Sequence, residues 1–294
     1  MNISVILCTL NRPRVLHDTI LSILRQELLP QEIIVAVPSL EHVSSDTLAL
    51  PSVKLLITPV GLCKQRNRAL EELSEDTEIV AFLDDDIELS THYLKEMARL
   101  FTTAPEVIIA SGRMLHDGGR GTRITREESI ARCQESDRSY ELRPLSFAPI
   151  DAGYGCNMIC RYSSIKSQRF DERLPLYGWL EDRDFSYRCT VNRYPAVCLD
   201  NAQAVHLGWR NGRVSGVRLG FSTVVNPIYL KRKTKMFSFH FIFIHYWVRC
   251  LIGNLIGLIT RDSDYDRRGL LQGNFRGFWH LLSGKCDPEH ILNL

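Results

Sequence analysis

The sequence predicts an α/β protein with a mixed central sheet flanked by helices and with a helical C-terminal extension. The first observation is a set of four apolar runs at residues 3–7, 33–37, 53–57 and 79–83. Runs that are apolar at every position are typical of strands covered on both faces, as in a parallel sheet. The second observation is helical character between these runs, which gives a βαβαβαβ order. The third is a long apolar segment of helical spacing at residues 237–260.

The elements around these strands follow in order. Pro13 suits the first turn of a helix over residues 13–28, because the backbone N–H that proline lacks has no helical partner there. A second helix is expected over about residues 62–73. Beyond the fourth strand, glycine-bearing stretches interrupt the alternation at residues 112–121, 153–155 and 208–220. Mixed strands and loops after an open sheet indicate a second half built on the same core, not a separate domain.

Length, composition and charge exclude several classes of protein. The 294 residues suit one large α/β domain or one domain with an appendage. With 45% apolar and 24% charged residues, the composition argues against a disordered, fibrous or polytopic membrane protein. A formal net charge of +2 gives no general argument for nucleic-acid binding. The nine cysteines lack the spacing of a disulfide framework and no secretory signal is visible, so a reducing cytosol is expected.

Three consecutive carboxylates, Asp84, Asp85 and Asp86, follow the fourth predicted strand. Ligands of open α/β sheets bind at this carboxyl edge. Three adjacent carboxylates repel one another, and a hard divalent cation that also bridges to phosphates relieves that repulsion. Because residues i and i+2 point the same way, Asp84 is expected to face a sugar or ribose and Asp86 a metal. The alternative is a solvated acidic turn, which the position at a strand end disfavours.

Residues 237–260 are long and apolar enough to span a bilayer as a helix. Arg249 near the centre, together with His245 and Asn254, argues against a clean span because charged and polar groups are costly in lipid. Helical spacing predicts one apolar face, made of Phe237, Phe241, Ile244, Val248, Leu251, Leu255 and Leu258. A basic cluster lies just upstream and consists of Lys231, Arg232, Lys233 and Lys235. An interfacial helix on an anionic membrane and a helix buried against the rest of the chain are both consistent with this pattern.

Six ordered segments carry a resemblance to a known family. They are VILCTLNRP at 5–13, GLCKQRNRA at 61–69, DDD at 84–86, GYGCNM at 153–158, GWLEDRDFSYR at 178–188 and HLGW at 206–209. In this order they resemble the family 2 glycosyltransferases, inverting metal-dependent enzymes with the GT-A fold, a Rossmann-like mixed sheet. The chain looks similar to the bacterial rhamnosyl- and galactofuranosyltransferases that build surface polysaccharide.

The resemblance implies a set of donor-binding residues. The polar positions of the family's nucleotide loop match Thr9, Asn11 and Arg12. The residues that contact nucleotide and diphosphate in the family match Arg66 and Asn67. The aspartate motif adds Asp84 and Asp85 to this donor-binding set, and a strand beside the sugar adds Asn157.

The resemblance also implies a catalytic base and a metal site. Glu181 and Asp182 fall in the acceptor-side acidic motif; the match assigns the general base to Asp182 and places Glu181 with the donor-binding residues. A helix starting near Trp179 would favour the same carboxylates through its dipole, so a capping role is the alternative. His206 matches a late histidine that completes the metal site with Asp86, and a hydrogen-bonded structural histidine is an equally good interpretation.

By this resemblance, residues 1–212 form the GT-A catalytic domain, with a nucleotide-sugar half at about 1–112 and an acceptor half at about 113–212. Beyond the resemblance, residues 213–294 are expected to form a helical C-terminal region, for which association with a membrane is one of the two interpretations given above. The implied activity is transfer of a hexosyl or deoxyhexosyl group from a nucleoside-diphosphate sugar to a hydroxyl of a glycan or lipid-linked acceptor. The expected cofactor is Mg²⁺ or Mn²⁺.

The implied setting is bacterial cell-surface polysaccharide synthesis in the cytoplasm; a position at the inner face of the cell membrane and a homo-oligomer are both compatible with it. Many family members carry an acidic residue that binds the uracil edge, but this chain has AVPS at the matching positions 36–39. The donors favoured here, dTDP- and UDP-sugars, follow from the resemblance to rhamnosyl- and galactofuranosyltransferases. Two other functions are consistent with the architecture: a non-catalytic module that binds sugar nucleotides, and a sugar nucleotidyltransferase. The first predicts degraded acidic motifs, and the second predicts a glycine-rich basic loop in place of Cys8–Asn11.

Overall fold

The computed structural model describes residues 1–50, 52–119, 121–191, 193–210, 214–260 and 265–294. The chain divides into two compact units. The first consists of Met1–Val60, Lys64–Arg169 and Phe185–Gly212. The second consists of Gly61–Cys63, Phe170–Asp184 and Arg213–Leu294. The predicted boundary between residues 212 and 213 lies outside the described residues.

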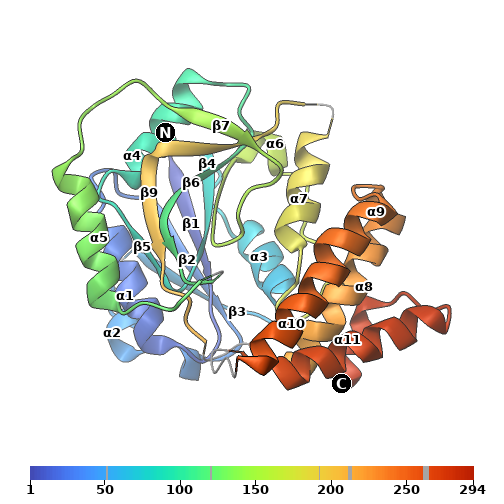
Figure 1. The fold of residues 1–294 in the computed structure, drawn as a ribbon. Coiled ribbons are helices and arrows are strands. Elements are labelled where there is room, and N and C mark those ends of the chain that lie inside the picture. The colour runs from blue at the N-terminus through green and yellow to red at the C-terminus, as the bar shows by residue number, and fades with distance from the viewer. Residues whose placement is uncertain (51, 120, 192, 211–213, 261–264) are drawn as a thin grey trace. The chain divides into compact units, whose positions relative to one another are not determined.

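The first unit is built on the parallel strands that the sequence predicts. They are β1 (Ile3–Cys8), β2 (Glu32–Val37), β3 (Val53–Ile57) and β4 (Ile79–Asp84), in the spatial order β3-β2-β1-β4. Two connecting helices, α1 (Pro13–Leu24) and α3 (Leu62–Leu70), lie on opposite faces of the sheet (Figure 1). Right-handed crossovers in opposite directions along a sheet require that placement.

Helix α1 ends four residues earlier than predicted. The reason is Gln26, whose Nε2 donates to the carbonyl of Ser90 and whose Oε1 accepts from the backbone N–H of Leu94. These two hydrogen bonds, at 2.8 and 3.0 Å, tie Gln26 to the segment from Ser90 to Leu94, and the chain leaves the helix before this residue.

The remaining strands make the sheet mixed. They are β5 (Ile87–Leu89), β6 (Ile109–Asp117), β7 (Phe147–Ile150), β8 (Asn157–Arg161) and β9 (Ala196–His206). The full order is β3-β2-β1-β4-β8-β6-β9-β5, and β7 pairs with β9. Strand β8 is antiparallel to both neighbours, and β9 runs parallel to β6 but antiparallel to β5 and β7. The second half therefore continues the same sheet, as predicted.

Short and long helices complete the elements that cover this sheet. They are η1 (Leu40–His42), α2 (Ser45–Leu48), α4 (Tyr93–Thr103), α5 (Arg126–Arg138), α6 (Tyr162–Ile165) and α7 (Glu181–Thr190). The start of α5 is a capping box, in which the Thr125 hydroxyl accepts from the Glu128 N–H and the Glu128 carboxylate accepts from the Thr125 N–H. The core under these helices is made of strand residues and of the inner faces of α1 and α4.

Most of the second unit is helical. Its C-terminal part contains α8 (Gly216–Thr234), α9 (Phe239–Phe241), η2 (Ile242–Val248), α10 (Arg249–Ile259), α11 (Arg267–Leu282) and η3 (Pro288–Asn293). Helix α11 packs closely on α8 because glycines stand at their crossing: a Cβ at Gly273 would overlap the carbonyl of Val217, and a Cβ at Gly220 would overlap that of Leu270. The predicted helical extension is confirmed.

The apolar face predicted for residues 237–260, with lipid and the rest of the chain as its two alternative partners, is not as a whole the packed side of this segment. The packed side includes Ile242, Tyr246 and Asn254, whereas Ile244 and Leu255 of the predicted face are exposed. One reason is η2, a π-helical stretch of seven residues that changes the turn angle and shifts the register of everything after it. A second reason is that Asn254 is buried on the packed side of α10 by its hydrogen bond to Asn274, although its hydropathy alone would place it in the solvent.

Candidate functional site

Strand register brings three chain segments to one edge of the first unit's sheet. Cys8 at the end of β1 is level with Asp84 at the end of β4. His206 at the end of β9 pairs with Ile87 of β5 on one side and with Asp117 of β6 on the other. The aspartates that follow β4 therefore meet the end of β9, although more than 100 residues separate them in sequence.

The side chains of Asp84, Asp86 and His206 form a cluster suited to a metal ion. Each offers one ligand atom, and these atoms all lie within 4.8 Å of one another. Nε2 of His206 is 3.2 Å from Oδ1 of Asp86 and 3.9 Å from Oδ2 of Asp84. Two carboxylates and one imidazole suit Mg²⁺ through the oxygens and Mn²⁺ through the whole set, so the residues fit the predicted cofactor. The structure also places Asp84, which the sequence assigned to the donor, among these ligand atoms.

Asp117 orients His206 and was missed by the sequence analysis. Its Oδ1 lies 3.0 Å from Nδ1 of His206 and accepts from the Gly119 N–H at 3.0 Å, while its Oδ2 accepts from the Tyr154 hydroxyl at 2.8 Å. A carboxylate only accepts, so Nδ1 carries a proton and Nε2 is the nitrogen that faces Asp84 and Asp86. The signal that could have pointed to Asp117 was the glycine-rich stretch that contains it. The structure shows why a glycine is needed there, since a Cβ at Gly119 would lie 2.6 Å from the His206 ring.

Burial and neighbouring charges set the protonation of this cluster. Burial alone would raise the pKa of Asp86, but the adjacent His206 and Arg12 lower it to about 2. Burial alone would lower the pKa of His206, yet Asp86 and Asp117 raise it to about 10. His206 is therefore an imidazolium among carboxylates at neutral pH. A divalent cation bound here would replace that charge and release the Nε2 proton.

The nucleotide-loop residues Thr9 and Arg12 both contact Asp85. The Thr9 hydroxyl donates to Oδ2 of Asp85, and Nη1 of Arg12 donates to Oδ1 at 2.7 Å. Burial raises the pKa of Asp85 to about 6, although Arg12 opposes the rise. Asn11 has a left-handed backbone with φ 59°, and its N–H donates to Nδ1 of His42 at 3.2 Å. The structure thus joins this predicted loop to the middle aspartate; contact of these residues with a nucleotide stays a prediction.

Arg66 brings a buried positive charge to the same cluster. It is 2% exposed, its Nη2 donates to the Gly155 carbonyl at 2.7 Å, and the same atom lies 3.8 Å from Oδ1 of Asp84. Its neighbour on α3, Asn67, is also buried. Asn157 is fully buried and its Nδ2 donates to the Gly112 carbonyl at 3.1 Å, while no described residue donates to its Oδ1. Arg66 is thus a fixed, buried positive charge beside Asp84, and its contact with a nucleotide or diphosphate stays a prediction.

Glu181 and Asp182 occupy the first turn of α7 and belong to the second unit. The Glu181 N–H donates to the Gly178 carbonyl at 2.7 Å, which closes a tight turn in which Gly178 has φ 68°. Oδ1 of Asp182 accepts from the Arg183 N–H at 2.8 Å. The helix starts close to the predicted position, and the roles of both carboxylates toward donor and acceptor stay predictions.

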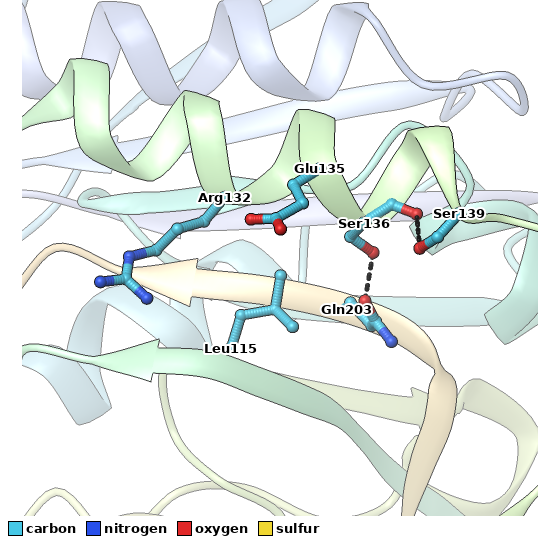
Figure 2. Close-up of a pocket in the computed structure, with 6 residues that line it drawn as sticks. All are labelled: Leu115, Arg132, Glu135, Ser136, Ser139 and Gln203. Atoms are coloured by element: carbon cyan, nitrogen blue, oxygen red, sulfur yellow. Dashed lines mark hydrogen bonds between the residues drawn. The ribbon is translucent and has the colours of Figure 1, made fainter.

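A separate pocket lies between α5 and the strands β6 and β9. Figure 2 shows its lining, which consists of Leu115, Arg132, Glu135, Ser136, Ser139 and Gln203. The hydroxyl of Ser136 is bonded to the side-chain carbonyl of Gln203 across it. It contains none of the predicted site residues.

Comparison with known families identifies the chain. The model of the family described as Glycosyl transferase family 2 matches residues 4–168. The chain belongs to glycosyl transferase family 2. No curated protein sequence gives a significant match.

Solved structures of other glycosyltransferases share the fold of this family 2 chain. The mannosyltransferase PcManGT from Pyrobaculum calidifontis, in complex with GDP-Man and Mn²⁺, is 13% identical with a TM-score of 0.58, covering 95% of this chain and 87% of that one. S. aureus TarS 1–349 in complex with UDP-GlcNAc is 16% identical with a TM-score of 0.52, covering 97% and 93%.

GalNAc-T7 with UDP, GalNAc and Mn²⁺ is 12% identical with a TM-score of 0.54, covering 84% of this chain. The family 2 chain spans only 57% of the length of GalNAc-T7. At such identities the likeness shows the fold alone, and it confirms the predicted GT-A architecture.

Proposed function

We propose that this family 2 protein is a metal-dependent inverting glycosyltransferase that moves a sugar from a nucleoside-diphosphate sugar to a hydroxyl of a glycan or lipid-linked acceptor. The observation that carries the proposal is the convergence of Asp84, Asp86 and His206 at the carboxyl edge of the sheet. Residues from two distant segments make that cluster, and Asp117 orients its histidine. A plain acidic turn needs no such histidine.

The donor is proposed to be a nucleoside-diphosphate sugar. Support comes from the structural neighbours, since PcManGT is complexed with GDP-Man and TarS with UDP-GlcNAc. Both guanine and uracil nucleotides therefore occur with this fold. We favour a dTDP- or UDP-linked hexose or deoxyhexose because of the resemblance to rhamnosyl- and galactofuranosyltransferases.

The residues of the chain have separate tasks in this proposal. Asp84, Asp86 and His206 would hold a divalent cation, which when bound supplies positive charge to the leaving diphosphate. Arg66 adds a fixed cation beside Asp84 and is held in place by the Gly155 carbonyl. Asp182 accepts the proton of the acceptor hydroxyl as that oxygen attacks the anomeric carbon from the face opposite the diphosphate. A single displacement of this kind inverts the configuration at that carbon.

We propose bacterial surface-polysaccharide synthesis in the cytoplasm as the setting of this reaction. The resemblance to rhamnosyl- and galactofuranosyltransferases supports that proposal. The acceptor would then be a growing glycan or its lipid-linked precursor.

A panel of nucleotide sugars tests the function. Thermal-shift measurements with and without Mn²⁺ report binding, because a ligand at 100 times its Kd stabilises the fold by about 2.7 kcal/mol. Release of nucleoside diphosphate with a glycan acceptor reports turnover. We expect one nucleotide sugar to bind only with the metal and to be consumed. Binding without turnover with any acceptor would favour a sugar-nucleotide-binding module, and pyrophosphate release from a nucleoside triphosphate and a sugar phosphate would favour a nucleotidyltransferase.

A further inference from the structure

The second unit exposes an extended apolar surface on its last two long helices. On α10 it consists of Ile252, Leu255 and Ile256, and on α11 of Phe275, Trp279 and Leu282. These six side chains, called here the α10–α11 surface, are each between 49% and 83% exposed. Figure 1 shows α10 and α11 beside α8 within this unit. Large exposed apolar patches mark sites of interaction.

The opposite sides of both helices are fixed by close contacts. On α10, Asn254 is buried; its Nδ2 donates to Oδ1 of Asn274 at 3.0 Å, and its Oδ1 accepts from Arg267 at 3.2 Å. On α11, Gly273 and Gly277 press against α8. The α10–α11 surface is therefore the side of each helix that the second unit does not use for its own packing.

These contacts favour a helix that lies on a membrane over one that crosses it. The continuous helix Phe239–Ile259 is long and apolar enough to span a bilayer, and only 22% of its most apolar window is buried. A spanning position would break the Asn254–Asn274 bond and put Arg249 near the bilayer centre, where a charge is costly. A helix parallel to the surface keeps these polar groups on the protein and lets its exposed face enter the lipid.

The region of the chain that carries this surface is strongly positive. Residues 213–294 contain 12 Lys and Arg against 5 Asp and Glu, a net +7, whereas residues 1–212 contain 24 against 29. The sequence from 214 to 260 has no acidic residue, and α11 has none either. Arg268 lies seven residues before Phe275 on the same face of α11, and Arg249 and Arg276 are exposed beside the apolar side chains. This charge distribution is complementary to anionic lipid headgroups.

One cation of the upstream basic cluster is committed to the protein. Lys233 forms ion pairs with Asp171 at 2.8 Å and with the buried Asp184 at 2.9 Å. The cations that lie on α10 and α11 themselves, beside the apolar side chains, are Arg249, Arg268 and Arg276.

We propose that the α10–α11 surface docks on a membrane of anionic phospholipid, with α10 and α11 in the plane of the headgroups. Phe275, Trp279 and Leu282 enter the boundary between headgroups and acyl chains, where Trp is favoured. The guanidinium groups of Arg249, Arg268 and Arg276 extend to the phosphates while their methylene stems cover apolar surface. This docking requires no transferase activity and is testable apart from it.

Vesicle flotation of the full chain tests the proposal. Phosphatidylglycerol–phosphatidylcholine vesicles should carry the protein at low salt and carry less at high salt, and pure phosphatidylcholine vesicles should carry little. The triple variant Arg249→Gln, Arg268→Gln and Arg276→Gln should reduce partitioning to anionic vesicles about a hundredfold, at about fivefold per cation. A matched control replaces three exposed cations of the first unit with Gln and should partition as wild type; these are Arg14, Arg138 and Lys166.

Apolar variants separate docking from charge alone. Phe275→Ser, Trp279→Ser and Leu282→Ser together should reduce partitioning at least about tenfold without unfolding the protein, since all three side chains are largely exposed. The matched control carries Ser at the exposed residues Leu29, Leu40 and Leu142. Tryptophan quenching by brominated lipids should occur in wild type and weaken when Trp279 is replaced.

Three results would overturn the proposal. The first is equal binding by wild type and both surface variants. The second is a stable dimer in solution that the serine variant alone converts to a monomer, because the surface would then join two copies of the chain. The third is membrane association that neither high salt nor alkaline carbonate reverses, because that result indicates a spanning helix.

Discussion

Replacing Asp117 with Asn tests the inferred geometry of the metal site without touching a proposed ligand. Asparagine has nearly the same shape but no charge, and it offers an N–H₂ group in place of one carboxylate oxygen. Asp117 accepts hydrogen bonds from Tyr154 and Gly119, and Nδ1 of His206 lies 3.0 Å from its Oδ1. Asp117→Asn should therefore weaken the hold on the His206 ring while leaving Asp84 and Asp86 in place.

The expected loss of metal affinity in Asp117→Asn follows from the role of Asp117 in orienting His206. Loss of a carboxylate that orients a ligating histidine costs about 10- to 100-fold in metal affinity, or about 1.4–2.7 kcal/mol. Tyr154→Phe removes one hydrogen bond to the same carboxylate but keeps its charge and its contact with His206, so it should cost less metal affinity than Asp117→Asn. Asp117→Asn should therefore lose the most Mn²⁺ affinity, and Tyr154→Phe should lose less. The exposed control Asp46→Asn should lose the least.

Titration with Mn²⁺, followed by electron paramagnetic resonance of the free ion, gives the Kd of each variant. The spectrum of the Co²⁺-loaded protein reports ligand geometry, which a merely structural defect would leave unchanged in the folded fraction. Circular dichroism checks that the variants are folded. A folded Asp117→Asn protein whose Mn²⁺ Kd stays within twofold of wild type, with an unchanged Co²⁺ spectrum, would refute the assignment.

The remaining predictions concern the same site and the buried thiols. Asp86→Ala should abolish Mn²⁺ binding and turnover with the fold intact; full activity of this variant in excess chelator would remove the metal from the mechanism. Asp182→Asn should keep the donor Kd measured by calorimetry and lose transfer by about a hundredfold or more, and an equally steep loss of donor binding would show that the base is misassigned. Gly119→Ala should weaken Mn²⁺ binding because its Cβ would meet the His206 ring at 2.6 Å, a conclusion that fails if the Kd is unchanged. Cys160, whose pKa burial raises, and the four other buried thiols should resist labelling with a thiol reagent until the protein unfolds, and rapid native labelling of all nine would contradict the core described here.

Local pattern was sufficient for the parallel half of the fold. Four apolar runs became β1 to β4 within one residue at each end, because strands covered on both faces must be apolar throughout. The position of Asp84 to Asp86 at a strand end was equally readable, and it located one half of the candidate metal site. The third member, His206, was named through family resemblance, and its neighbouring sequence alone did not distinguish a ligand from a structural histidine.

Local pattern failed where a helix is packed by polar contacts. The 3.6-residue period placed Leu255 on an apolar face, for which lipid and the rest of the chain were both possible partners; the structure exposes Leu255 and buries Asn254. Hydropathy assigns each residue from its own side chain, whereas Asn254 is buried because Asn274, from another helix, satisfies its hydrogen bonds. The π-helical register of η2 cannot be read from a regular helical period.

The sequence by itself determined the four parallel strands of the first half, the aspartates at the end of the fourth strand and the family to which the chain is similar. Each of those depends on neighbours along the chain or on ordered motifs. Only the tertiary structure decided that Asp117 holds His206, that Lys233 is paired with Asp171 and Asp184, and which side of α10 and α11 is left exposed. These contacts join residues that lie 49 to 89 positions apart in the sequence, and such pairings exist only once strand register and helix packing have fixed which side chains meet.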